Sequence, residues 1–329
     1  MQLPRFEETE KPMATRAAGR RVMAAFQQFS PTMLGGAADL VESTYTVFEG
    51  AGVFSRHFAG RNIPFGVREH GMGAIVNGLG LHGGLLKPYG STFLIFSDYM
   101  RPAVRLSALM SLPVVWVWTH DSVGLGEDGP THQPVEHYAA LRAIPNLWVV
   151  RPGDPNETSI AWKIALERQD GPTALLLTRQ AVPVLDPDMV TGAERGGYVL
   201  WEADGANGSP DLVILATGSE VSISLVAAKS LEGDGVAARV VSLPCWELFE
   251  SQPGDYRDSV IPPDVDARLS VEAGVSLGWA KWVGSRGDSL SIEHFGASAP
   301  GATVLEKFGY TADNVARRAR ALLERRQTV

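Results

Sequence analysis

Short apolar runs alternate with amphipathic segments along most of the chain. Residues 157–168 and 220–231 have the spacing of amphipathic helices. Runs rich in Val, Ile, Leu and Trp, which are typical of buried strands, occur at residues 113–118, 147–149, 173–177, 211–216 and 238–242. Because parallel strands need a crossover helix, this alternation predicts an α/β fold with mainly parallel sheets flanked by helices.

The alternation is interrupted at residues 182–197, which contain two prolines, three glycines and several acidic residues. This composition is typical of a linker. A chain of 329 residues is also long enough for two domains. We therefore expect a first domain at 1–186, a linker at 187–197 and a second domain at 198–329.

Composition and charge narrow the class of protein. Hydrophobic residues make up 45% and charged residues 20%, as in a globular protein, and no apolar stretch approaches the roughly 20 residues that span a bilayer. The net charge of -8 argues against a nucleic-acid-binding surface, and the single cysteine, Cys245, is typical of a reducing compartment. We expect a cytoplasmic protein that binds neither membranes nor nucleic acids.

Ionisable and aromatic residues concentrate in the first domain. Residues 65–73 read FGVREHGMG, and Glu69 is placed at the start of a helix after a short predicted strand at 63–65, where a carboxylate favours the helix dipole. Phe93, Phe96 and Tyr99 recur at intervals of three, a spacing that taken alone is more often found in a plain core.

Two further segments have more than one interpretation. His132 lies close to Glu136 and His137, but Pro134 interrupts the helical spacing of a metal site, so we expect no metal ligands in this chain. Residues 217–220 lie between a predicted strand and a predicted helix, where free N–H groups could bind an anion. A helix N-cap at Ser219 is the favoured interpretation.

Several blocks together resemble one family. They read GAADL at 36–40, KPYGSTF at 87–93, SDYMRPAVRL at 97–106, THDSVGLGEDGPTHQP at 119–134, RP at 151–152 and SIEHFGASAP at 291–300. With FGVREHGMG, they resemble the C-terminal half of transketolases over nearly the whole chain. The resemblance implies that 1–186 is the pyrimidine-binding domain of a thiamine-diphosphate enzyme and 198–329 the transketolase C-terminal domain.

The resemblance also implies which residues bind the cofactor. Glu69 would hydrogen-bond a pyrimidine nitrogen of thiamine diphosphate and favour the imino form that generates the reactive carbanion, and burial would raise the pKa of its carboxyl group. Phe93, Phe96 and Tyr99 would line the pyrimidine pocket. Asp39 would approach the thiamine across a subunit interface.

Other residues are implied to bind a sugar phosphate. His120 and His132 would contact sugar hydroxyls and transfer protons, which with Glu69 makes three expected catalytic residues, and Asp128 would bond the C2 hydroxyl. The phosphate would be held by the two guanidinium groups of Arg16 and Arg179, supported by Ser43.

Half of a transketolase is missing from this sequence. Family members hold the diphosphate through a Gly-Asp-Gly motif, followed by an Asn that helps to bind Mg²⁺ or Ca²⁺. Residues 233–235 read GDG, but they follow a predicted helix in the second domain and 255–265 contain no Asn, so we interpret them as a turn. Because Met1 opens directly on the pyrimidine-binding domain, we expect a split enzyme in which a partner subunit binds the metal ion and the diphosphate, plausibly as an α2β2 heterotetramer.

The expected reaction is transfer of a two-carbon ketol unit from a ketose phosphate to an aldose, as in the pentose phosphate route or a specialised pathway. One alternative is the β subunit of a 2-oxo acid dehydrogenase, which has similar length and domains but needs no His/Asp set for a polyol. A second alternative is a non-catalytic scaffold subunit. Ala37 and Thr44 depart from the Ser and Asn that the family often has there, which leaves the substrate open.

Overall fold

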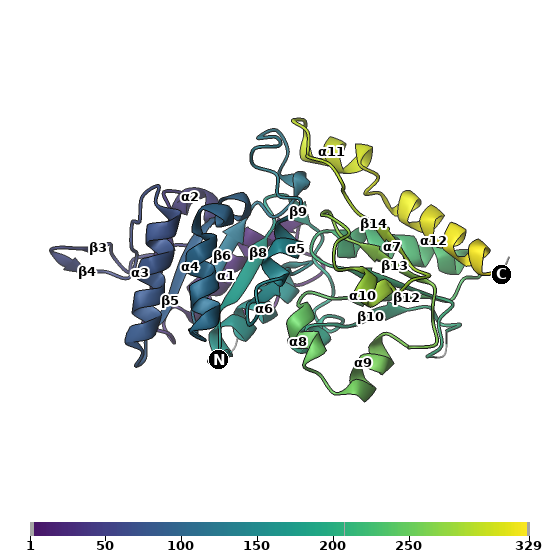
Figure 1. Ribbon diagram of the computed structural model, residues 1–329, viewed down its shortest axis with the longest axis horizontal. Helices are drawn as coiled ribbons and strands as arrows, with labels where there is room; N and C mark the ends of the chain where they lie inside the picture. The colour runs from purple at the N-terminus through teal and green to yellow at the C-terminus, as the bar shows by residue number, and fades with distance from the viewer. Residues whose placement is uncertain (1–2, 207, 328–329) are drawn as a thin grey trace.

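The computed structural model describes residues 3–206 and 208–327, with side chains described up to residue 325. Two α/β domains lie side by side along the long axis of the molecule, and the C-terminal helix lies at the end farthest from the first domain (Figure 1). No helix among these residues is long and apolar enough to cross a membrane.

The first domain is built on a sheet whose neighbouring strands all pair in parallel. In spatial order the strands are β2 (Met33–Ala37), β5 (Lys87–Phe93), β6 (Val115–Thr119), β8 (Thr173–Leu177) and β7 (Trp148–Val150). The helices of this domain are α1 (Thr15–Phe26), α2 (Val41–Thr44), α3 (Glu69–His82), α4 (Ser97–Leu109), α5 (His137–Arg142) and α6 (Pro155–Glu167).

Both faces of this sheet are buried, as the alternation along β6 illustrates. Val115 and Val117 pack into the core on the side of α1 and α6. Trp116 and Trp118 point the other way and pack into the core beneath α3, α4 and α5. A strand buried on both faces has a continuous apolar sequence, and this explains why β6 and β8 could be predicted from sequence.

Two strands of this sheet were not predicted from the sequence, and one predicted strand is wrong. β2 and β5 contain glycines and a proline because the chain passes unusually close to its neighbours here: a Cβ at Gly35 would lie 2.0 Å from the carbonyl oxygen of Tyr89. The expected strand at 63–65 is extended but is not a strand. In this segment, the Ile63 N–H donates a hydrogen bond to Gly35 O at 2.7 Å. The preceding residue, Asn62, forms an isolated parallel bridge with Gly35.

The second domain has a mixed sheet in which only the edge strand β10 pairs antiparallel. In spatial order its strands are β10 (Tyr198–Glu202), β12 (Ala238–Ser242), β11 (Leu212–Ala216), β13 (Arg268–Val271) and β14 (Asp288–Leu290). One face is covered by α7 (Glu220–Gly233), α11 (Gly301–Lys307) and α12 (Ala312–Gln327), the other by α8 (Trp246–Glu250), α9 (Gly254–Val260) and α10 (Ala280–Val283).

The predicted fold class is therefore confirmed, and the predicted elements agree closely with the structure. β8 and β12 have the expected bounds. Apart from the segment at 63–65, the other predicted strands and the two predicted helices differ from the structure by at most two residues at either end. Gly233 is the last residue of α7, and the expected turn is formed by Asp234 and Gly235. The domain boundaries stay a prediction, and a 3-10 helix, η3 (Thr191–Arg195), lies within the expected linker.

Two small antiparallel pairs complete the fold. β1 (Met13–Ala14) pairs with β9 (Ala181–Val182). β3 (Phe54–Ser55) and β4 (Phe58–Ala59) form a hairpin that projects from the first domain, away from the second (Figure 1).

The side chain of Asn156 ties the N-terminal segment to the first domain. Its Oδ1 accepts a hydrogen bond from Phe6 N at 2.9 Å, and its Nδ2 donates to Phe6 O at 2.8 Å and to Leu185 O at 2.9 Å. All three bonds are buried, so an amide at this position satisfies main-chain groups that no water reaches.

We expect Asn156→Ala to lower the free energy of unfolding of the first domain by about 2–4 kcal/mol, because it leaves three buried main-chain groups without a partner. Thermal unfolding followed by circular dichroism checks this. The matched control is Gln169→Ala, which removes an exposed amide just after α6 and should change stability by less than about 0.5 kcal/mol. An Asn156→Ala variant as stable as the control would contradict the assignment.

Candidate active site

Side chains from distant parts of the sequence meet at one edge of the first sheet. Asp39 follows β2, Phe93 is the last residue of β5, His120 follows β6 directly and Arg179 follows β8. Because β2, β5, β6 and β8 are parallel and adjacent, their carboxyl ends lie together. Ligands of open α/β sheets bind at this edge.

Three aromatic rings form a ladder at this edge. The ring centroids of Phe93 and Phe96 are 5.7 Å apart with an interplanar angle of 12°, and those of Phe96 and Tyr99 are 5.8 Å apart at 21°. Phe93 is buried, whereas Tyr99 is 65% exposed. A row of nearly parallel rings that ends in an exposed aromatic side chain offers an apolar surface on which a flat heteroaromatic ring can stack.

Glu69 is the first residue of α3, as expected. The preceding segment runs parallel to β2, so α3 begins at the same edge of the sheet as the aromatic ladder. The Glu69 side chain is buried at 8% exposure, and within residues 3–206 and 208–327 its carboxyl group has no hydrogen-bond or ion-pair partner. With no partner from the described part of the chain, the carboxyl group is free to bond a donor or acceptor supplied by a ligand.

His120 is held in an uncommon backbone conformation next to the ladder. Its φ is 59°, in the left-handed region, and its ring stacks on Phe93 with centroids 3.7 Å apart. Nδ1 is engaged with the Thr119 hydroxyl at 2.8 Å, which leaves Nε2 as the nitrogen available to a ligand. Burial and the nearby charges of Arg16, Arg179 and His132 lower the pKa of His120 to about 3, so the imidazole is neutral at physiological pH.

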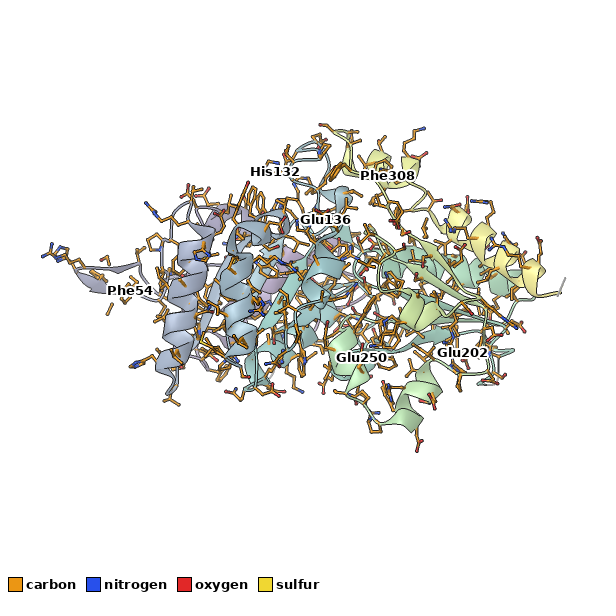
Figure 2. The ribbon with its side chains drawn as sticks, viewed as in Figure 1. Phe54, His132, Glu136, Glu202, Glu250 and Phe308 are labelled. Carbon is orange, nitrogen blue, oxygen red and sulfur yellow. The ribbon has the colours of Figure 1, made fainter. Side chains whose placement is uncertain are left out.

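The loop between His120 and His132 folds back over the edge of the sheet. His132 contacts two rings of the ladder, with centroids 5.5 Å from Phe96 and 6.3 Å from Phe93 (Figure 2). Its Nδ1 lies 2.9 Å from the hydroxyl of Thr131. Asp128 is exposed on the same loop, and no recorded contact joins it to the other expected site residues.

Two arginines lie next to His120. Arg16 Nη1 donates a hydrogen bond to the carbonyl oxygen of Ser43, and its guanidinium group packs over Tyr45 at 4.8 Å from the ring centroid. Burial lowers the pKa of Arg16, and the nearby positive charge of Arg179 adds to this. Across the described part of the chain neither guanidinium group is paired with a carboxylate. Two neighbouring cations without counterions form a site for an anion such as phosphate.

Asp39 lines a separate cavity of about 200 Å³ behind this edge. Its φ is 63°, so it adopts the left-handed conformation that Asp tolerates better than most residues. Gly36, Ala37, Thr46 and Gly66 are among the other lining residues.

The structure also tests two groups of residues that were considered from the sequence, one as a metal site and one as an anion site or helix cap. His137, not His132, joins Glu136 and Asp98 in a group whose potential ligand atoms lie within 4.8 Å of one another. The ring is already used there, since Nε2 lies 3.2 Å from the Asp98 carboxylate. Ser219 does precede α7, but its side chain makes no cap and donates instead to Glu220 at 2.5 Å.

Sequence reasoning missed Tyr45 and Thr119, which hold Arg16 and His120 in place. In the structure, both positions are marked by an uncommon backbone conformation, at Tyr45 itself and at His120, which follows Thr119. Tyr45 has a φ of 60°, so with Asp39 and His120 three of the five described non-glycine residues with positive φ belong to this region. Such strain clusters at functional sites, but side-chain patterns do not reveal it.

Comparison with known proteins identifies the family. The family model for the transketolase pyrimidine binding domain matches residues 11–184, and that for the transketolase-like C-terminal domain matches 196–311. The chain is 53% identical over 321 residues to the transketolase of Halalkalibacterium halodurans, which covers 96% of this chain and 48% of the relative. It is 51% identical over 336 residues to that of Mycobacterium tuberculosis, covering 98% and 48%.

Solved structures agree. A transketolase mutant from Pichia stipitis in complex with xylulose 5-phosphate superposes with a TM-score of 0.93 at 42% identity, covering 99% of this chain and 48% of the other. A split-gene transketolase described as an inactive β4 tetramer superposes with a TM-score of 0.74 at 27% identity, covering 95% of this chain and 99% of the other. The chain thus spans about half the length of the curated relatives it matches. It belongs to the transketolase family, of which it carries the pyrimidine-binding and C-terminal domains.

Proposed function

We propose that this chain is one subunit of a split, thiamine-diphosphate-dependent transketolase, which transfers a two-carbon ketol unit from a ketose phosphate to an aldose or aldose phosphate. The observation that carries the proposal is the grouping of unpaired Arg16 and Arg179 with neutral His120 beside the aromatic ladder. This places an anion site, a hydroxyl-binding imidazole and an apolar stacking surface within one edge of the sheet.

The cofactor proposal rests on Glu69 and the ladder. Thiamine diphosphate, when bound, supplies a nucleophilic carbon to which the ketol unit can be transferred. Phe93, Phe96 and Tyr99 would offer the pyrimidine ring a stacking surface, and Asp39 would approach the thiamine. The carboxyl group of Glu69, a residue that is 8% exposed, has no partner in the described residues and would hold a proton in a hydrogen bond to a ring nitrogen.

The remaining residues would bind the sugar phosphate. The guanidinium groups of Arg16 and Arg179 would grip the phosphate, with the Ser43 hydroxyl nearby. Nε2 of His120 would bond a substrate hydroxyl and accept or return its proton, with His132 in the same role. Asp128, exposed on the loop, would bond the C2 hydroxyl.

A partner subunit would cover a face of the first domain that carries several exposed apolar side chains. On α3 and α4 the exposed apolar residues include Ile75, Leu81, Leu106 and Leu109. The projecting hairpin adds Phe58 and also Phe54, which points outward from the domain (Figure 2). Apolar residues that gather in this way mark protein interfaces. The partner would bring the diphosphate-binding domain and its Mg²⁺ or Ca²⁺ ion, in an α2β2 complex, and similarity to a split-gene transketolase supports this.

The alternatives fit less well. A 2-oxo acid dehydrogenase β subunit would have no use for two unpaired phosphate-binding arginines beside His120. A scaffold subunit would have no need to bury the unpaired carboxyl group of Glu69.

The first prediction from this proposal concerns assembly. The purified chain, supplied with thiamine diphosphate and Mg²⁺, should not transfer ketol units, because the proposal assigns the diphosphate-binding domain to the partner. Co-expression with the chain that carries this domain should restore transfer from xylulose 5-phosphate, the ligand named for the Pichia stipitis structure, or from another ketose phosphate in a donor panel. Turnover by the chain alone would refute the requirement for a partner.

The second prediction concerns Glu69. In the assembled complex, Glu69→Ala should lower kcat by about 10²–10⁴-fold, because the proton held at the pyrimidine ring is lost. Steady-state kinetics at saturating cofactor provide the measurement. Glu306→Ala, which removes an exposed carboxylate on α11, is the control and should leave kcat unchanged. Full activity of Glu69→Ala would show that the carboxyl group has another role.

The third prediction concerns the charge of His120. Its pKa is lowered from 6.5 to about 3, so the folded chain should keep this ring neutral while the unfolded chain takes up a proton as the pH falls below 6.5. This residue therefore lowers stability progressively as the pH falls through the window from 6.5 to 3. NMR titration of the imidazole, assigned with His120→Asn, should show no midpoint above about pH 4. A midpoint near 6.5 would contradict a buried, neutral ring.

A further inference from the structure

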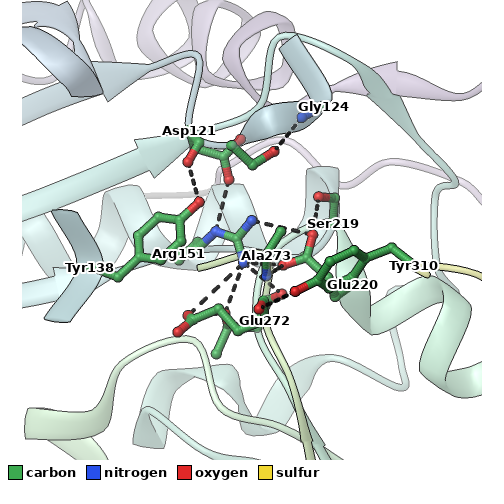
Figure 3. A network of polar contacts seen from close by, with 12 residues as sticks. Asp121, Gly124, Tyr138, Arg151, Ser219, Glu220, Glu272, Ala273 and Tyr310 are labelled. Carbon is green, nitrogen blue, oxygen red and sulfur yellow. Dashed lines mark hydrogen bonds and ion pairs between the residues drawn. The ribbon is translucent and has the colours of Figure 1, made fainter. Parts of the chain in front are cut away.

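A fully buried arginine joins the two domains. Arg151 follows β7 in the first domain, and its Nε donates to the Asp121 carboxylate at 2.8 Å (Figure 3). Its Nη1 reaches into the second domain, where it donates to Thr217 O at 3.1 Å, to the Thr217 hydroxyl at 3.0 Å and to the Glu220 carboxylate. One guanidinium group therefore fixes the turn before α7 against the segment after β6.

A second arginine strengthens the same junction. Nη1 and Nη2 of Arg142 donate to the two oxygens of Glu272 at 2.8 Å each. The Thr217 hydroxyl and Trp279 Nε1 donate to the same carboxylate at 2.6 and 3.0 Å. Burial raises the pKa of Glu272, but Arg142 and Arg151 outweigh it and hold the pKa at about 2. Glu272 is therefore an anion at neutral pH and faces Arg142 as an ion pair.

The turn before α7 is shaped to receive Arg151. Gly218 has a φ of 57°, and a Cβ at this position would lie 2.4 Å from the central carbon of the guanidinium group. The Ala273 N–H also donates to Glu220 at 3.0 Å, which fixes the carboxylate that faces Arg151. The residues first considered as an anion site or a helix cap thus form a receptor for an arginine of the other domain.

This junction acts on the residue next to His120. The Asp121 carboxylate is held by Arg151, and its carbonyl oxygen accepts a hydrogen bond from the Tyr138 hydroxyl (Figure 3). Asp121, the residue that follows His120, is therefore held through both its side chain and its carbonyl oxygen. His120 has a φ of 59°, and a non-glycine residue keeps such a conformation only where the surrounding contacts hold it there.

The second domain also holds the loop that carries His132. The Gln133 side-chain amide donates to Ala297 O at 3.0 Å, and the Ser298 hydroxyl donates to Glu127 O at 2.5 Å. A Cβ at Gly301 would lie 2.1 Å from Gly124 O, so the start of α11 lies directly against the loop. The loop is thus fixed near its base by Arg151 and along its length by the segment before α11.

We propose that Tyr138 and Arg151 are positioning residues for His120, and that the C-terminal domain serves the reaction by bracing the 119–133 loop through Glu220, Glu272 and the 296–301 segment. The proposed catalytic residues of this chain, Glu69, His120 and His132, all belong to the first domain. The second domain fixes the positions of His120 and His132. This inference rests on the proposed function insofar as His120 binds substrate.

The test uses the assembled complex and the variant Tyr138→Phe. Phenylalanine keeps the ring that packs on Arg151, at 4.7 Å from its guanidinium carbon, and removes only the hydroxyl that holds Asp121. The expected result is a fall in kcat of about 10- to 100-fold with an unchanged KM for thiamine diphosphate, because a small displacement of His120 affects the sugar and not the cofactor ladder. Arg151→Lys, which keeps the charge but loses the fork, should act in the same direction.

The matched control is Tyr198→Phe. Tyr198, like Tyr138, donates a buried hydrogen bond through its hydroxyl, in this case across the domains to Glu157 at 2.6 Å, and no hydrogen bond joins it to the His120–Asp121 segment. It should lower the melting temperature by a similar amount and leave kcat within about twofold of wild type. An unchanged kcat in Tyr138→Phe, or an equal loss in both variants, would overturn the proposal.

A second measurement does not depend on activity. Hydrogen exchange of the segment 119–133 in the free chain should be faster in Tyr138→Phe than in wild type or Tyr198→Phe. If the wild-type complex transfers no ketol units, the proposed function fails, and this exchange alone decides whether the Tyr138 hydroxyl positions the segment after His120. Equal exchange in all three proteins would then overturn it.

Discussion

The parallel direction of β2, β5, β6 and β8 is the constraint on which the rest of the site depends. Because these strands run the same way and pair side by side, each delivers the residue after its carboxyl end to the same edge. Asp39, Phe93, His120 and Arg179 are separated by up to 140 positions in the sequence, yet the sheet brings their segments together. The double burial of β6 maintains this alignment, since a shift in register would move Trp116 or Val117 out of its core.

Electrostatics at this edge differ from those of the molecule as a whole. The chain carries a net charge of -8, which by itself would repel a sugar phosphate. Arg16 and Arg179 reverse the sign locally, and their charges add to the effect of burial, which is the main cause of the lowered pKa that keeps the His120 imidazole neutral. A neutral imidazole can accept a proton from a hydroxyl group, whereas an imidazolium cannot. The same pair of cations can thus attract an anion and preserve a base next to it.

Which strands could be predicted from the sequence depended on whether their residues form an apolar run. The apolar runs of β8 and β12 predicted those strands with their bounds, whereas glycines interrupt β2 and β5, β5 also contains a proline, and close packing requires the glycine at Gly35. The start of α3 at Glu69 was also predicted correctly. Nothing local to Tyr138 or Arg151 indicates that they meet at Asp121, because these contacts join segments 17 and 30 residues apart in the sequence that come together only through tertiary packing.

The hairpin of β3 and β4 has a thermodynamic consequence for assembly. Each strand is only two residues long, and Phe54 and Phe58 are exposed. Its base is secured by Asn62, whose side chain bonds both main-chain groups of Phe48. A ribbon this short is marginally stable in water without a covering surface. Part of the free energy of any association on this face is therefore spent on ordering the hairpin, so affinity should weaken more steeply on heating than the buried area alone would require.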